Sequence, residues 1–110
     1  MTQSEYEQQA EETLNAIEEA LEAADTDDVD YERRAAGILE LEFGDGSKII
    51  INRQSATQEI WVAARAGGFH FRWTGQAWED TRDGTELFRA LERLASSQAG
   101  AAVELTRGRP

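Results

Sequence analysis

The chain has 110 residues, with 22 acidic and 11 basic side chains, a net charge of −11, and no cysteine. This length predicts one domain over residues 1–110, and 40% apolar residues exclude a disordered chain. The lack of cysteine excludes disulfides, zinc ribbons, thiol catalysis and thiolate-bound iron–sulfur clusters. No apolar run reaches the roughly 20 residues that cross a bilayer, and the start lacks the basic region of a signal peptide. We therefore expect a cytoplasmic protein.

The negative charge is concentrated at one end of the sequence. Residues 1–32 carry twelve acidic side chains and no basic one, whereas residues 33–110 carry ten acidic and eleven basic ones. A surface of this kind repels nucleic acids and anionic membranes, and it attracts metal cations and basic protein surfaces. We therefore expect no nucleic-acid or membrane binding, and a cation or a basic protein as the partner of this segment.

The first expected element is an amphipathic helix over residues 5–24. Ser4 and Glu7 match the capping box that marks a helix start. Apolar residues then recur at spacings of three and four, which places them on one side of the helix. These residues are Tyr6, Ala10, Leu14, Ile17, Leu21 and Ala24. The opposite side is acidic, so we expect the helix to pack on the domain with its carboxylates toward solvent.

A series of short strands is expected over residues 31–80. Alternation of apolar and polar residues predicts strands over 38–43 and 48–54, joined by a hairpin turn at 44–47. The other expected strands are 31–35, 59–65, 69–73 and 77–80. Because the connections are short, neighbouring strands should be antiparallel.

A second amphipathic helix is expected over residues 85–98, with Gly100 at its end. Two such helices and one sheet bury their apolar faces most simply as an α+β two-layer sandwich. We expect two helices packed on one face of a five- to six-stranded antiparallel sheet, with the other face open to solvent. The tail around Val103 and Leu105 is expected to pack, and residues 107–110 to fray.

The open sheet face carries a tryptophan. Alternation turns Ile60 and Val62 inward, so Trp61 points outward, and Asn52 lies across from it if the chain turns at 55–58. An exposed tryptophan beside amide side chains is typical of a protein interface. The alternative is that the tail or a loop covers it.

Several stretches resemble the frataxin family, in its bacterial CyaY type. They are residues 46–54 (Gly-Ser-Lys-Ile-Ile-Ile-Asn-Arg-Gln), the pair Ile60-Trp61 and residues 67–71 (Gly-Gly-Phe-His-Phe). The acidic first helix and the order of elements also match, over nearly the whole chain. The resemblance implies an iron-binding protein of iron–sulfur cluster assembly, which regulates or supplies iron to a complex of cysteine desulfurase and scaffold protein.

The resemblance also implies the sites. The implied metal ligands are Glu18, Glu19, Glu22, Asp25, Asp27, Asp28, Asp30 and Glu32. The implied partner-binding residues are Asn52, Arg53, Gln54, Trp61 and His70. Carboxylate oxygens suit both Fe2+ and Fe3+, but one histidine and no cysteine cannot form a tight transition-metal cage. We therefore expect weak, exchangeable iron binding, with other divalent cations competing. Glu59 and Glu7 depart from the family pattern, which commonly has Gln at the first position and in some bacterial members His at the second.

No catalytic serine, histidine and aspartate set and no phosphate-binding loop is visible, so we do not expect an enzyme. One alternative is ferroxidase or iron-storage activity on the same carboxylates, and another is a metal-independent acidic inhibitor of a basic protein. A third is an ordinary solvated helix face. We expect a monomer, with iron-driven oligomers as an open alternative.

Overall fold

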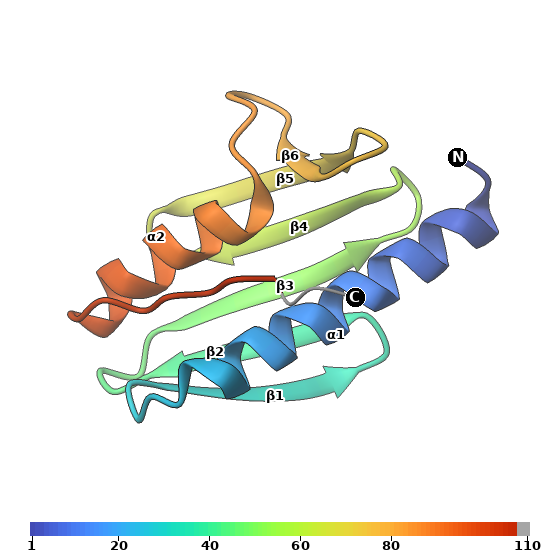
Figure 1. Cartoon of the computed structure of the whole chain (residues 1–110). Helices are drawn as coiled ribbons and strands as arrows, with labels where there is room; N and C mark the ends of the chain where they lie inside the picture. Colours follow the sequence, from blue (N-terminus) through green and yellow to red (C-terminus); the bar gives the residue numbers. More distant parts are fainter. Residues whose placement is uncertain (108–110) are drawn as a thin grey trace.

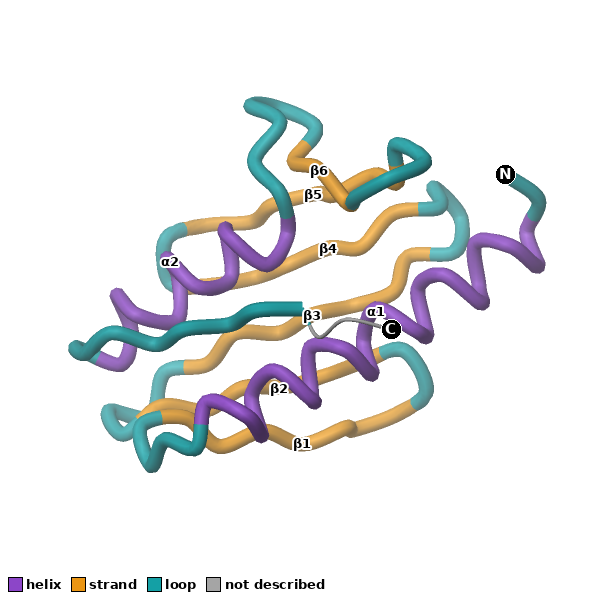
Figure 2. Tube along the Cα trace, viewed as in Figure 1, coloured by secondary structure: helices purple, strands orange, loops and turns teal. Residues whose placement is uncertain are grey.

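The computed structural model describes residues 1–107 and has two layers, helices on one side and a sheet on the other (Figure 1). The elements are α1 (Gln3–Ala24), β1 (Val29–Ala35), β2 (Ile38–Phe43), β3 (Lys48–Gln54), β4 (Glu59–Ala64), β5 (Gly67–Trp73), β6 (Trp78–Asp80) and α2 (Leu87–Ala99). The six strands form one antiparallel sheet in chain order, with β1 and β6 at its edges. Both helices cross the same face (Figure 2), which confirms the expected α+β sandwich.

The start of α1 differs from the sequence prediction. Its cap is Thr2, whose hydroxyl accepts a hydrogen bond from the Glu5 backbone N–H at 3.1 Å. The Glu5 carboxylate in turn accepts from the Thr2 backbone N–H at 2.7 Å. The capping box therefore lies two residues before the predicted pair, and Ser4 and Glu7 lie inside the helix.

The predicted bounds of β2 and β3 are confirmed, and the other boundaries shift by one or two residues. β1 begins at Val29 rather than at residue 31, and β5 begins at Gly67 rather than at residue 69. α2 begins at Leu87 because the Glu86 side chain accepts hydrogen bonds from the N–H groups of the first turn, as an N-cap does. Gly100 ends α2 in the left-handed conformation, as predicted.

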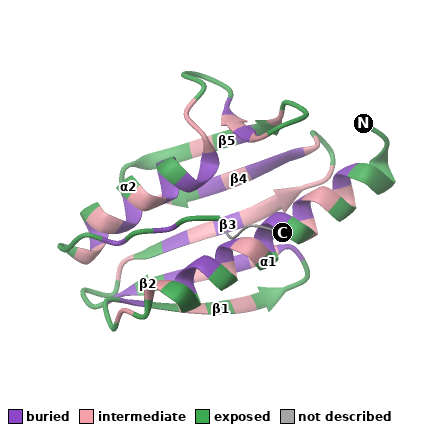
Figure 3. Cartoon of the chain, viewed as in Figure 1, coloured by how far each residue is buried: buried purple, intermediate pink, exposed green. Residues whose placement is uncertain are grey.

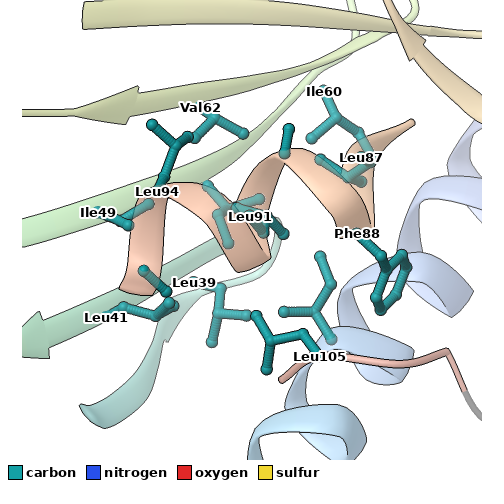
Figure 4. Close-up of a cluster of buried hydrophobic side chains, with 14 of the residues drawn as sticks. Leu39, Leu41, Ile49, Ile60, Val62, Leu87, Phe88, Leu91, Leu94 and Leu105 are labelled. Carbon is teal, nitrogen blue, oxygen red and sulfur yellow. The ribbon is translucent and has the colours of Figure 1, made fainter. Parts of the chain in front are cut away.

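The core lies between the helices and the sheet, and the C-terminal segment completes it. Val103 and Leu105 are each 2% exposed and belong to the same buried cluster as Phe88. The segment that carries them runs between α1 and α2 (Figure 1), and Figure 4 shows Leu105 in the cluster. The backbone N–H of Leu105 donates to the Glu92 carboxylate at 2.9 Å, which fixes the segment along α2. The expectation that this tail packs is confirmed. Of the stretch expected to fray, residues 108–110 lie outside the described residues.

Two buried hydrogen bonds connect α1 to the sheet. The Tyr6 hydroxyl donates to the Glu59 carbonyl at 2.7 Å, and the indole N–H of Trp78 donates to the Thr13 hydroxyl at 2.9 Å. The Tyr6 and Trp78 rings meet edge to face, with centroids 6.1 Å apart. Burial raises the pKa of Tyr6 to about 12, above its ordinary value of 10.0.

This pKa predicts a loss of stability in alkali. Between pH 10 and 12 the unfolded chain ionises Tyr6 before the folded chain does, so the free energy of unfolding falls by up to about 3 kcal/mol, at ~1.4 kcal/mol per pKa unit. In Tyr6→Phe that fall should be absent, whereas at neutral pH the variant should be about 1 kcal/mol less stable through the lost hydrogen bond. Urea denaturation at several pH values measures both effects. Parallel pH profiles of the two proteins would contradict the assignment.

Candidate functional site

The open face of the sheet carries Trp61 as predicted, although the residue is half-buried rather than exposed. Across β3, β4 and β5 the register aligns Asn52, Trp61 and His70, and the neighbours Ile60 and Val62 are buried on the helix side. Figure 3 colours the buried positions, which lie along both helices and on the strands that the helices cross. The C-terminal segment packs on that helix side as far as residue 107, so its described part does not cover Trp61.

Trp61 is held by its neighbours on this face. Its ring stacks on the His70 imidazole, with centroids 4.3 Å apart and planes 8° from parallel. Its indole N–H donates to one carboxylate oxygen of Glu59 at 2.8 Å. The other oxygen accepts from the Arg72 guanidinium at 2.8 Å. The sequence singled out Glu59 only as a departure from a family pattern and missed these contacts.

The Glu59 carboxylate is buried although it lies on the open face, with 8% of its side chain exposed. Burial alone would raise the pKa of this carboxyl, but the hydrogen bonds from Trp61 and Arg72 outweigh it and hold the pKa below the ordinary value of 4.5. Glu59 is therefore ionised at neutral pH. Its charge is balanced by Arg72, while the His70 Nδ1 lies 3.8 Å from the carboxylate oxygen that Trp61 contacts.

The structure corrects the expected placement of Arg53. Gln54 pairs with Glu59 across β3 and β4 and shares the open face, whereas Arg53 pairs with Ile60 and shares the helix face. The Arg53 guanidinium contacts the carboxylate of Glu7 at 3.5 Å and lies over Gly37. Side chains alternate along a strand, so Arg53 cannot share a face with Asn52 and Gln54. We therefore remove it from the predicted partner-binding surface.

The eight predicted metal ligands lie in three separate places. Glu18, Glu19 and Glu22 lie on α1, Asp25, Asp27 and Asp28 in the loop that follows, and Asp30 and Glu32 on β1. The guanidinium of Arg33, on β1, contacts the carboxylates of Glu11 and Glu18 on α1. The Tyr31 hydroxyl donates to the carboxylate of Glu22, and this hydrogen bond raises the pKa of Tyr31. These side chains join α1 to β1.

The acidic residues of β1 face away from α1. Asp30 pairs with Glu42 and Glu32 with Glu40 in the β1–β2 register, on the open face of the sheet. Lys48 and Arg34 contact the Glu40 carboxylate at 3.4 and 2.9 Å. The open face therefore has an acidic half on β1 and β2 and an aromatic and amide half on β3 to β5. The sequence did not predict that these two halves share one face of the sheet.

Within residues 1–107, no three histidine, aspartate or glutamate side chains converge on a point that could hold a metal ion. Of the predicted ligands on α1, Glu18 is already contacted by the Arg33 guanidinium and Glu22 by the Tyr31 hydroxyl. In the same part of the chain, neither helix combines the length and apolarity that membrane crossing requires.

Known proteins resemble this chain over almost its full length. The family model described as Frataxin-like domain matches residues 1–101. The "Iron-sulfur cluster assembly protein CyaY" of Dechloromonas aromatica is 57% identical over 105 residues, which cover 96% of this chain and 99% of that protein. The protein of the same name from Janthinobacterium sp. is 56% identical over 108 residues, which cover 96% of each chain.

Solved structures share the fold. Frataxin from Psychromonas ingrahamii is 34% identical with a TM-score of 0.88, and the match covers 97% of this chain and 100% of that chain. Trimeric frataxin from the yeast Saccharomyces cerevisiae, complexed with ferrous iron, is 26% identical with a TM-score of 0.70. That match covers 83% of this chain and 85% of the yeast chain.

Proposed function

Because the chain belongs to the frataxin-like family, we propose that it acts in iron–sulfur cluster assembly in the bacterial cytoplasm. It binds iron and regulates, or supplies iron to, the complex of a cysteine desulfurase and its scaffold protein. The curated relatives that share more than half of its residues are named for this process. The observation that carries the proposal is the open sheet face, on which the Trp61 ring is stacked on His70 while the core lies on the other side.

The two halves of the open face suit two kinds of contact. Asn52, Gln54, Trp61 and His70 form the half that binds the scaffold protein, because a fixed aromatic pair flanked by amides has the composition of an interface centre. Asp30 and Glu32, together with their pairing partners Glu42 and Glu40, form an acidic surface that suits a basic surface of the desulfurase. We expect the chain to bind as a monomer.

Iron is cargo in this proposal. Carboxylate oxygens are suitable ligands for both Fe2+ and Fe3+, and the yeast relative is complexed with ferrous iron. Because the carboxylates lie apart on α1, the loop and β1, iron exchanges readily and other divalent cations compete.

An anaerobic Fe(II) titration followed by amide NMR tests the metal assignment. We expect shifts confined to residues 15–32 and to Glu40 and Glu42 of β2, which pair with Glu32 and Asp30. A variant with Glu18→Gln, Glu19→Gln and Glu22→Gln should bind iron on the order of tenfold more weakly, because it loses ligand charge. The matched control removes the same charge elsewhere, through Glu79→Gln, Asp83→Asn and Glu86→Gln near the start of α2, and should bind like wild type.

The outcomes separate the alternatives. No shift at millimolar iron would overturn iron binding and leave a metal-independent acidic inhibitor of a basic protein. Equal iron affinity of the two triple variants would show that α1 is not the site. We propose no enzymatic activity, and oxygen consumption by the Fe(II)-loaded protein above the rate of free Fe(II) would instead establish a ferroxidase.

A further inference from the structure

Glu59 is the one acidic side chain of the open face, among the described residues, that is buried. Most carboxylates are exposed, and a buried one is retained only when its hydrogen bonds are satisfied. Here one oxygen accepts from Trp61 and the other from Arg72, each at 2.8 Å. The buried charge thus lies below the surface at which the partner would bind.

We propose that Glu59 is the positioning residue of this surface, and that its carboxylate holds the Trp61–His70 pair in the orientation that binds the scaffold protein. The inference rests on the proposed function for the identity of the partner. The hydrogen bond fixes the indole plane of Trp61, and the fixed plane allows His70 to stack on it at 4.3 Å. A surface that is rigid before binding avoids the loss of side-chain entropy on association, which costs about 0.5–1.5 kcal/mol per immobilised side chain.

This arrangement defines the chemistry of the contact. The indole N–H of Trp61 already donates to Glu59, so Trp61 offers the partner only its ring. Hydrogen bonds to the partner come instead from the amides of Asn52 and Gln54, which lie on the same face. The surface therefore fits a partner segment that packs an apolar or planar side chain on the rings and presents polar groups beside it.

If the Glu59 side chain served only to stabilise the fold, its substitution would change stability without changing Trp61 or the affinity for the partner. The hydrogen bond that joins this residue to α1 comes from Tyr6 and ends on the backbone carbonyl, so side-chain substitution leaves it in place. Substitution of the carboxylate therefore acts on the open face, and its effects are read from Trp61 and from partner affinity rather than from stability alone.

The test compares Glu59→Ala with the conservative Glu59→Gln in the full chain. The Gln amide oxygen still accepts the indole N–H, whereas Ala offers no acceptor. The control is Glu79→Gln. Arg72 on β5 pairs with Glu59 on β4 and with Glu79 on β6, so the control removes a carboxylate from the other neighbouring strand. Indole N–H exchange of Trp61 is measured by NMR, and affinity for the scaffold protein encoded in the same genome by calorimetry.

We expect Glu59→Ala to raise the indole exchange rate and to weaken scaffold binding about tenfold, the loss of one hydrogen bond to a charged group. Glu59→Gln and Glu79→Gln should bind within about threefold of wild type, by the same scale. Wild-type affinity in Glu59→Ala would overturn the positioning role, whether or not the indole is released. Equal weakening in Glu59→Gln and Glu59→Ala would also overturn it. Failure of the wild-type chain to bind the scaffold protein would instead overturn the proposed function.

Discussion

Trp61→Arg should weaken binding of the scaffold protein by at least about 100-fold, since truncating a central interface tryptophan typically costs 2–4 kcal/mol. The variant removes the ring that stacks on His70, and it introduces a charge where the partner packs. Folding should be retained because the apolar neighbours Ile60 and Val62, and not Trp61, face the core. Calorimetry gives the affinity, and urea denaturation checks the fold.

Ala63→Arg is the matched control for this substitution. Ala63 is exposed, lies two residues further along β4 and therefore points from the same face. It pairs with Ile50 on β3 and with Gly68 on β5, so a long side chain is accommodated there. A loss of affinity in Ala63→Arg as large as in Trp61→Arg would assign the effect to charge on the face rather than to the ring. An unfolded Trp61→Arg variant would show that the side chain belongs to the core.

The strands could be predicted from the sequence because apolar and polar residues alternate with a period of two, and because one face of the sheet is buried while the other is open. The same period placed Trp61 on the open face and Asn52 opposite it, as the register confirms. It also requires Arg53 to face the helices, so the family resemblance assigned that residue to a surface that the alternation already excluded.

The start of α1 could not be fixed from local sequence. Thr2 with Glu5 and Ser4 with Glu7 both fit the capping pattern of a hydroxyl residue followed three residues later by glutamate. Which of the two pairs caps the helix depends on how α1 packs on the sheet, where the Tyr6 hydroxyl donates to the Glu59 carbonyl at 2.7 Å. Such a contact between residues 53 positions apart is not visible in a local pattern.

The arrangement of the site residues likewise depends on contacts that a local sequence pattern does not reveal. A run of acidic residues predicts a charged surface, but which carboxylates share a face depends on the strand register, and Asp30 and Glu32 lie on the open face rather than with α1. The contacts of Glu59 with Trp61 and Arg72 join two strands and depend on the side-chain geometry of both. A Glu at an outward position next to an outward tryptophan was the available signal.

Leu105→Asp should lower the free energy of unfolding by about 3–5 kcal/mol, because it places an unpaired charge among apolar side chains. Leu105 is 2% exposed and completes the core between α1 and α2, in a cluster that also contains Leu39 and Leu91 (Figure 4). Leu105→Ala keeps the site apolar and should cost less, about 2–4 kcal/mol, through the cavity alone. Urea denaturation measures both.

Thr106→Asp is the control, since it adds the same charge to the neighbouring residue, which is exposed. We expect its effect to stay within about 0.5 kcal/mol, as for surface substitutions in general. The comparison tests whether the C-terminal segment is a structural part of the domain. Because a domain of this size is stable by only about 5–15 kcal/mol, Leu105→Asp should remove a large share of that stability. Equal urea midpoints for Leu105→Asp and Thr106→Asp would show that the segment does not pack between the helices in solution.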